Sequence, residues 1–158
     1  MDTSMFHGSL VTTSRILYTP SAFARTSLIH LQETGSLRAT KPHTSQRKNL
    51  ASYLFFLVCS GGGTLQYAGR TRPLRAGDCV FLDCQKPYSH RTSDDLWQLK
   101  WVHFYGPNMN SIYDKYTERG GGPCFHTKNP EPYDRLLNKL YETAASEDHV
   151  RDMRIFET

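Results

Sequence analysis

The sequence predicts a mainly β fold, in which an antiparallel barrel is followed by two to three C-terminal helices. Short apolar or alternating segments recur at intervals of about eight to twelve residues from Ser27 to Phe104, separated by turn residues. After Gly106 the spacing of apolar residues becomes helical. The chain has 158 residues, which is enough for one domain with its own core.

Apolar content and turn residues mark the individual strands. A weakly alternating segment at Ser27 to Glu33 is expected to be the first strand, ending at Gly35. The polar, basic segment from Thr40 to Asn49 is expected to be a loop or an edge. Further strands are predicted at 53–59, 64–67, 71–74, 79–83, 89–92 and 97–104, with a hairpin turn at Ala68-Gly69-Arg70.

The C-terminal third is predicted to be helical. One helix carries Met109 to Tyr116, between Pro107 and the glycines that start at Gly120. The next is expected to be capped by Asn129. It carries an apolar stripe that contains Tyr133, Leu136, Leu137, Leu140, Tyr141 and Ala144. A third helix with Val150, Met153 and Phe156 runs into Thr158 without a stop signal, so we expect the chain to be the N-terminal piece of a longer protein.

These segments suggest three parts. Residues 1–25 lack a clear period and are expected to form an N-terminal arm rather than a core element. Residues 26–106 are expected to form the barrel, and residues 107–158 a helical segment that mediates dimerisation. The leucines and the tyrosine of its stripe are the candidate dimer interface, namely Leu136, Leu137, Leu140 and Tyr141. Packing of the same stripe on the chain's own barrel is the competing interpretation.

Composition favours a cytoplasmic protein. The formal net charge of +4 is mild, and the basic residues are scattered along the chain. The four cysteines form no CxxC pair, and two of them lie in apolar strands, which is typical of reduced, buried thiols. The N-terminus does not resemble a signal peptide, and the apolar run from Tyr53 to Cys59 is too short to span a membrane.

The usual catalytic patterns are missing from the sequence. There is no nucleophile-elbow motif, no zinc-ligand spacing, and no paired carboxylate beside His90 or His103. The glycines from Gly61 to Gly63 lack the context of a phosphate-binding loop. We therefore expect no catalytic residue, no metal and no cofactor.

Binding of a small molecule is better supported. Trp97, Leu99, Trp101 and His103 share one face of the last predicted strand, because side chains alternate. Sugar rings pack on such aromatic faces while their hydroxyl groups form hydrogen bonds around the edge. Core packing is the competing interpretation for the two tryptophans, and a structural hydrogen bond for His90 and His103.

The order of these segments resembles the N-terminal ligand-binding and dimerisation domain of AraC-type transcription regulators. The residues that carry the resemblance are Arg47, Tyr53-Leu54, Gly61-Gly62-Gly63, Leu74, Gly77-Asp78, Pro87, His90, Trp97, Trp101-Val102-His103-Phe104 and Gly106. The resemblance implies a cupin-like antiparallel β-barrel (double-stranded β-helix) without metal, dimerisation through the helices, and a C-terminal helix-turn-helix DNA-binding domain that is absent here. In metal-binding cupins a carboxylate precedes the closing glycine, but the corresponding position here is Leu54, Phe55 or Phe56.

The resemblance also implies roles for individual residues. By this likeness Trp101 stacks on a sugar, Arg47 contacts it, and His90 lines the pocket. Trp97, Tyr88 and His103 complete our candidate ligand site. The implied protein is an effector sensor that forms a homodimer, binds a carbohydrate, reaches DNA only through the absent domain, and does not contact membranes.

Two other functions remain open at this stage. One is a cupin-type enzyme that acts on a sugar. The other is a dimerisation module whose barrel is fully packed and binds nothing, in which case Trp101 would have no cavity beside it.

Overall fold

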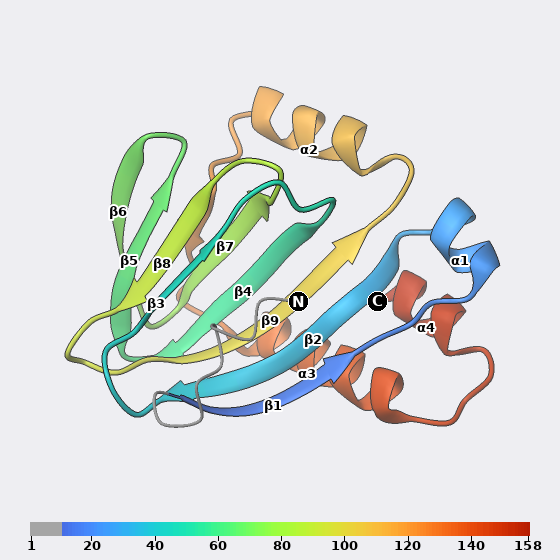
Figure 1. Ribbon diagram of the computed structural model, residues 1–158, viewed down its shortest axis with the longest axis horizontal. Coiled ribbons are helices and arrows are strands. Elements are labelled where there is room, and N and C mark those ends of the chain that lie inside the picture. Colours follow the sequence, from blue (N-terminus) through green and yellow to red (C-terminus); the bar gives the residue numbers. More distant parts are fainter. Residues whose placement is uncertain (1–10) are drawn as a thin grey trace.

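Two antiparallel sheets face each other in the computed structural model, which describes residues 11–158 (Figure 1). The larger sheet has the order β1-β2-β9-β4-β7-β10 and the smaller one β3-β8-β5-β6. The strands of the larger sheet are β1 (Val11–Leu17), β2 (His30–Ala39), β4 (Tyr53–Ser60), β7 (Asp78–Asp83), β9 (Gln98–Tyr105) and β10 (Cys124–His126). Those of the smaller sheet are β3 (Thr44–Arg47), β5 (Gly62–Tyr67), β6 (Arg70–Arg75) and β8 (Tyr88–Thr92).

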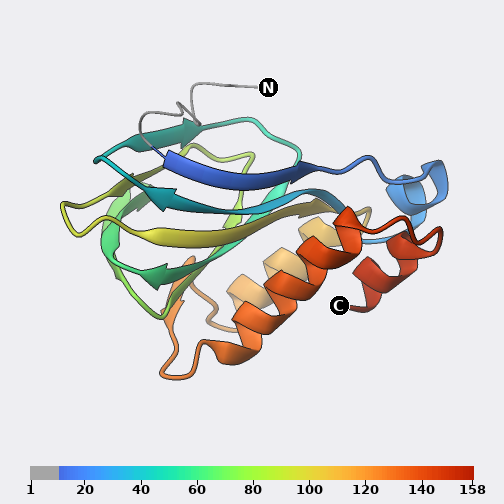
Figure 2. The same cartoon turned by 90° about the horizontal axis from the view of Figure 1, so that it is seen from below.

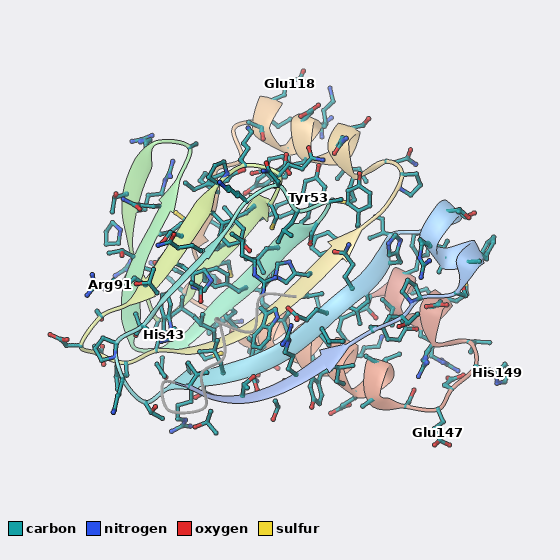
Figure 3. The ribbon with its side chains drawn as sticks, in the orientation of Figure 1. His43, Tyr53, Arg91, Glu118, Glu147 and His149 are labelled. Atoms are coloured by element: carbon teal, nitrogen blue, oxygen red, sulfur yellow. The ribbon has the colours of Figure 1, made fainter. Side chains whose placement is uncertain are left out.

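The four helices are α1 (Ala22–Ser27), α2 (Met109–Glu118), α3 (Glu131–Ala145) and α4 (Arg151–Glu157). Figure 2 shows α3 lying along the outer face of the larger sheet. Residue Leu137 of α3 and Ile155 of α4 pack there on Leu31, Leu57 and Val102. The helix α2 instead packs on Tyr53, which Figure 3 labels at the start of β4, through Met109 and Tyr113. The predicted mainly β fold with C-terminal helices is confirmed.

The main core fills the space between the two sheets. Its members alternate along their strands, as a half-buried sheet requires, and include Leu54, Phe56 and Val58 of β4, Leu65 of β5, Val80 and Leu82 of β7, and Leu99 and Trp101 of β9. The side chains of the larger sheet that point away from the barrel interior face the helices. The barrel therefore has one continuous apolar interior, and the predicted alternation of Leu99, Trp101 and His103 is confirmed.

The N-terminal part differs from the expected arm. Residues Val11–Leu17 form β1, which pairs with β2 along all seven residues, so this segment belongs to the larger sheet. Its Thr and Ser side chains are exposed because β1 is an edge strand, and this hid the alternation from sequence analysis. The rest of the expected arm, residues 1–10, lies outside the described residues.

The strand β2 also extends further than predicted. It begins at His30 and runs through Gly35 to Ala39, where a strand end had been expected at Gly35. A Cβ at Gly35 would lie 2.4 Å from the Ser14 carbonyl oxygen and 2.8 Å from Cη2 of Trp101. This glycine is therefore a point of close approach rather than a turn. The three-residue strand β10, between α2 and α3, was not predicted.

Candidate functional site

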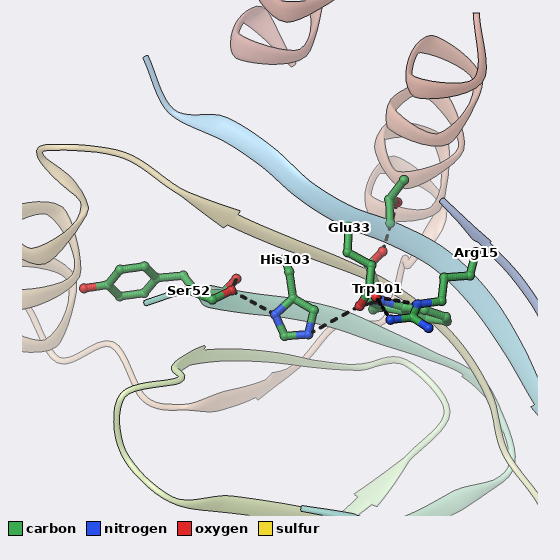
Figure 4. A network of polar contacts seen from close by, with 7 residues as sticks. Arg15, Glu33, Ser52, Trp101 and His103 are labelled. Atoms are coloured by element: carbon green, nitrogen blue, oxygen red, sulfur yellow. Dashed lines mark hydrogen bonds and ion pairs between the residues drawn. The ribbon is translucent and has the colours of Figure 1, made fainter. Parts of the chain in front are cut away.

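Polar side chains gather at one end of the barrel interior, around the Glu33 carboxylate (Figure 4). Glu33 lies on β2 beside a β-bulge, which places its side chain inside the barrel. Its Oε2 accepts a hydrogen bond of 3.1 Å from Nε1 of Trp101. Its Oε1 forms an ion pair with Arg15 of β1. One buried carboxylate thus connects β1, β2 and β9.

His103 extends this network toward β4. Its Nε2 lies 3.8 Å from Oε2 of Glu33, and its Nδ1 lies 2.9 Å from the Ser52 hydroxyl. Burial, with the positive charges of Arg47 and Arg15, lowers the pKa of His103 to about 3. The ring is therefore neutral at pH 7, and its contact with Glu33 is not an ion pair. The carboxylate favours the tautomer with the proton on Nε2, so that Nδ1 accepts the Ser52 proton.

His90 lies on the smaller sheet, opposite this network. Its ring stacks on Tyr88 at a centroid distance of 6.2 Å and lies 5.6 Å from the ring of Trp97. Burial, followed by the charges of neighbouring histidines and Arg47, lowers the pKa of His90 to about 3. Within residues 11–158 its Nδ1 has no hydrogen-bond partner, which is uncommon for a buried nitrogen.

His43 is a second buried histidine with an unpartnered nitrogen. It lies just before β3, as Figure 3 shows, and burial lowers its pKa. No partner for its Nε2 is found in the described part of the chain. Two imidazoles from the smaller sheet thus have unused hydrogen-bonding capacity in a largely apolar interior.

A small cavity of about 20 Å³ separates the two sets of side chains. It is lined by Leu37, Leu54, Phe56, Tyr88, His90, Leu99, Trp101 and His103. This volume is enough for one water molecule. The cavity borders Trp101 but is too small for a sugar in this conformation, so it does not by itself distinguish the sensor from the dimerisation module.

Four of the six candidate ligand residues line this cavity: Trp101, His90, Tyr88 and His103. Arg47 ends β3 opposite Tyr88, and its charge acts on both His90 and His103. Trp97 does not line the cavity. It is fully buried and packs on Gly63, where a Cβ would lie 2.4 Å from its ring.

Sequence analysis missed Glu33, Arg15, Ser52 and His43. Glu33 had been placed at the end of a strand, and Arg15 in an arm without regular structure. The signal that could have found Glu33 is its parity with Leu37 and Ala39 along β2, which puts a carboxylate on an apolar face.

The site does not fit a metal ion. Cupin metal sites need several His and carboxylate ligands, but here Leu54 and Phe56 occupy the β4 positions that face His90. Within residues 11–158, no three His, Cys, Asp or Glu side chains come together in a group that could hold a metal. All four cysteines are free thiols, and burial raises the pKa of Cys79 to about 11 and that of Cys84 to about 12.

The candidate dimer residues of α3 divide between two environments. Leu137 is 4% exposed and packs on the sheet, with Leu140 partly buried beside it. Leu136 is 43% exposed. Tyr141 is half-buried. None of the helices in residues 11–158 is long and apolar enough to cross a membrane.

The two facing antiparallel sheets define a cupin-like barrel domain, and comparisons with known proteins agree. The model of the AraC-like ligand binding domain matches residues 29–156, so the chain belongs to this family. The AraC-like transcriptional activator CuxR has a similar structure, with a TM-score of 0.56 and 14% identity. The match covers 79% of this chain and 47% of CuxR, so this chain spans about half the length of that protein.

Two further solved structures are similar at lower scores. The cupin domain of an XRE-family transcriptional regulator from Enterobacter cloacae has a TM-score of 0.48 and 15% identity, and the match covers 62% of this chain and 98% of that one. Ectoine synthase from P. lautus has a TM-score of 0.47 and 12% identity, with 77% and 79% covered. No curated protein matches in sequence. The match to the family model places the chain among ligand-binding domains of this type.

Proposed function

We propose that this domain is the effector sensor of an AraC-type transcription regulator and that it binds a carbohydrate in the barrel, beside Trp101. The observation that carries the proposal is the position of Trp101. Its Nε1 is already used by Glu33, so the polar edge of the ring is fixed and its apolar surface borders the cavity. A sugar ring can pack on that surface, with its hydroxyl groups directed to neutral His90 and His103.

Binding a sugar requires the cavity to widen. The strand β3 is suited to such a movement, because it is an edge strand of four residues that pairs with β8 alone. It carries the buried Ser45 and ends at Arg47, whose charge acts on His90 and His103, and His43 lies just before it. A shift of β3 would expose the unpartnered nitrogens of His43 and His90 to the incoming hydroxyl groups. Binding is thus coupled to a rearrangement, as a sensor requires.

The same network offers a route from the barrel to the C-terminal helix. Glu33 contacts Trp101 inside and Arg15 on β1. Directly after β1, the Tyr18 hydroxyl donates a 2.6 Å hydrogen bond to Asp152 of α4. The Ser21 N–H donates a second bond to the same carboxylate. A ligand that displaces Glu33 would therefore move a strand that is tied to α4, and through α4 a DNA-binding domain.

We further propose that the domain forms a homodimer through the exposed side of α3 around Leu136 and Tyr141, that it is cytoplasmic, and that it is not an enzyme. Support for the last point comes from the chemistry of the site. The buried imidazoles are neutral, the thiols are held protonated by burial, and Glu33 is paired with Arg15. No group in this set is an activated nucleophile.

Single-tryptophan fluorescence tests the binding proposal. The chain contains two tryptophans, so Trp97→Phe leaves Trp101 as the only reporter. Titration with a panel of monosaccharides and oligosaccharides is expected to give a saturable change in Trp101 emission with at least one sugar. In the Trp101→Phe variant, the remaining Trp97 should respond weakly, because it does not line the cavity. Emission of Trp101 that stays constant across the whole panel would reject a carbohydrate effector.

A further inference from the structure

A second, larger cleft lies at the end of the smaller sheet, outside the barrel cavity. It has a volume of about 580 Å³ and is formed by the end of β3, the β5–β6 hairpin and the start of β8. Three of its lining residues are charged, and all three are cations: Arg47, Lys48 and Arg70. Tyr67 and Tyr88 are the buried members of its wall, and Tyr88 also borders the barrel cavity.

The strands around this cleft are rich in positive charge. The strands of the smaller sheet carry five arginines, Arg47, Arg70, Arg72, Arg75 and Arg91, and no Asp or Glu. In the described part of the chain, Lys48 and Arg70 take part in none of the ion pairs, which all involve other residues. Two cations in a concave site that take part in no ion pair raise the local concentration of anions.

The hairpin that carries Arg70 is held in an unusual conformation. Ala68 has a φ of 53° and Gly69 a φ of 74°, as a two-residue turn of type I′ requires. Alanine is uncommon in this left-handed region, and such residues occur preferentially at ligand sites. The turn places Arg70 opposite Tyr67, whose hydroxyl donates to the Asp83 carbonyl oxygen at 3.2 Å. This bond ties the hairpin to β7, so the cation lies on a fixed wall.

We propose that this cleft binds a small molecule with at least two negative charges on phosphate or carboxylate groups. Its volume lies within the range of about 300–1,000 Å³ that is typical of small-molecule sites. The Arg70 guanidinium suits a two-point contact with either anion, Lys48 adds a point charge, and Arg47 adds positive charge from the wall of the cleft. Gln46, Gln66 and Ser89 supply neutral hydrogen-bonding groups around them.

The shape of the site favours a small anion over nucleic acid. Lys48 and Arg70 lie together at the cleft, whereas Arg75 and Arg91 are exposed arginines of the same sheet outside it. A nucleic-acid surface would need a line of phosphate contacts along an exposed face. Trp101 does not line this cleft, so this proposal can be tested apart from the carbohydrate proposal.

Isothermal titration calorimetry tests the proposal with two probes, fructose 1,6-bisphosphate and citrate, at about 0.15 M salt so that distant charges are screened. At least one probe is expected to bind saturably, at one molecule per chain, while fructose shows no binding that depends on these cations. The double variant Lys48→Gln/Arg70→Gln should weaken binding by about tenfold or more, because two charge-assisted contacts are lost.

The matched control is Arg75→Gln/Arg91→Gln, which removes two charges from the same sheet outside the cleft. It should change the affinity by less than about twofold. Equal losses in both double variants would overturn the proposal, since the attraction would then be long-range. Failure of both probes to bind would also overturn it, as would binding of a short DNA duplex in their place. Because Trp101 is intact in every variant, its fluorescence response to sugars shows separately whether the barrel site has failed.

Discussion

Trp101 and Glu33 form a buried hydrogen bond, in which the indole Nε1 donates to Oε2 at 3.1 Å. The tryptophan is 5% exposed and lies against Gly35, so its ring has little freedom to turn. The bond joins the best candidate for stacking on a ligand to the carboxylate that also holds Arg15. The proposed ligand contact and the position of β1 therefore depend on the same side chain.

Substitution of Glu33 by Gln should be strongly destabilising. The amide oxygen can still accept the Trp101 bond, but Arg15, whose side chain is 15% exposed, loses its charge partner. Breaking a buried ion pair from one side costs about 3 kcal/mol of the free energy of unfolding, which urea denaturation can measure. The matched control is Glu118→Gln, which removes an exposed partner of Lys115 and should cost less than about 0.5 kcal/mol. Similar small losses in both variants would show that the buried pair contributes nothing.

Substitution of Gly35 by Ala should disturb Trp101 directly. The new Cβ would lie 2.4 Å from the Ser14 carbonyl oxygen and 2.8 Å from the indole, so β1 or the ring must shift. We expect a loss of about 2 kcal/mol in stability and a change in the near-ultraviolet circular dichroism of tryptophan. Gly122→Ala is the control, because its nearest atom is 3.7 Å away. A Gly35→Ala protein with unchanged stability and spectrum would contradict the packing described here.

The buried histidines predict a loss of stability in acid. The pKa values of His90 and His103 are about 3 in the fold, against a usual value near 6.5, because burial disfavours the charged rings. Above pH 6.5 the two histidines are neutral in both the folded and the unfolded state, so their burial causes no pH-dependent loss of stability. As the pH falls from 6.5 toward 3, the unfolded state binds more protons, so each histidine costs about 1.4 kcal/mol per pH unit, or about 2 kcal/mol at pH 5.

Thermal denaturation of His90→Gln across pH 5 to 7 tests whether burial of His90 lowers the stability in acid. The slope of its unfolding free energy against pH should correspond to the uptake of about one proton fewer on unfolding than in the unmodified chain. His149→Gln, at an exposed position, should leave the slope unchanged. An unchanged slope in His90→Gln would mean that His90 is not held neutral by burial.

The proposed dimer surface can be separated from the core on a single helix. Leu136 is 43% exposed, whereas its neighbour Leu137 is 4% exposed against the sheet. Leu136→Glu should leave the chain folded. In analytical ultracentrifugation this variant should sediment as a monomer, whereas the unmodified chain should sediment as a dimer. Leu137→Glu should instead unfold the chain, because it buries a charge. A dimer that survives Leu136→Glu, or an unmodified chain that sediments as a monomer, would reject this surface.

Much of the fold was predictable because burial follows strand and helix periods. The apolar run at Tyr53, the alternation around Trp101 and the stripe at Leu137 each specify one face that must be buried, and each lies where expected. The edge strand β1 was missed because an edge exposes polar side chains and so loses its alternation.

The site was only partly predictable. Trp101 and His103 of β9 meet Tyr88 and His90 of β8 because the inward-facing positions of the two sheets face each other across the barrel interior. Trp97 shares the parity of Trp101 but lies deeper, above Gly63, because it precedes β9 and turns into the core. Glu33 was missed because the strand was expected to end at Gly35, which hid its parity with Leu37 and Ala39, and because a bulge separates it from Leu31.

The central claim is that Trp101 faces a ligand inside the barrel, and a thermal-shift screen tests it most directly. The screen compares the unmodified domain, Trp101→Phe and Trp97→Phe against a panel of monosaccharides and oligosaccharides, each shift being taken relative to the same variant without sugar. A ligand that binds the folded state raises the melting temperature by mass action. We predict a shift with at least one sugar that is retained in Trp97→Phe and reduced in Trp101→Phe. A shift of equal size in all three proteins, or none with any sugar, would contradict the claim.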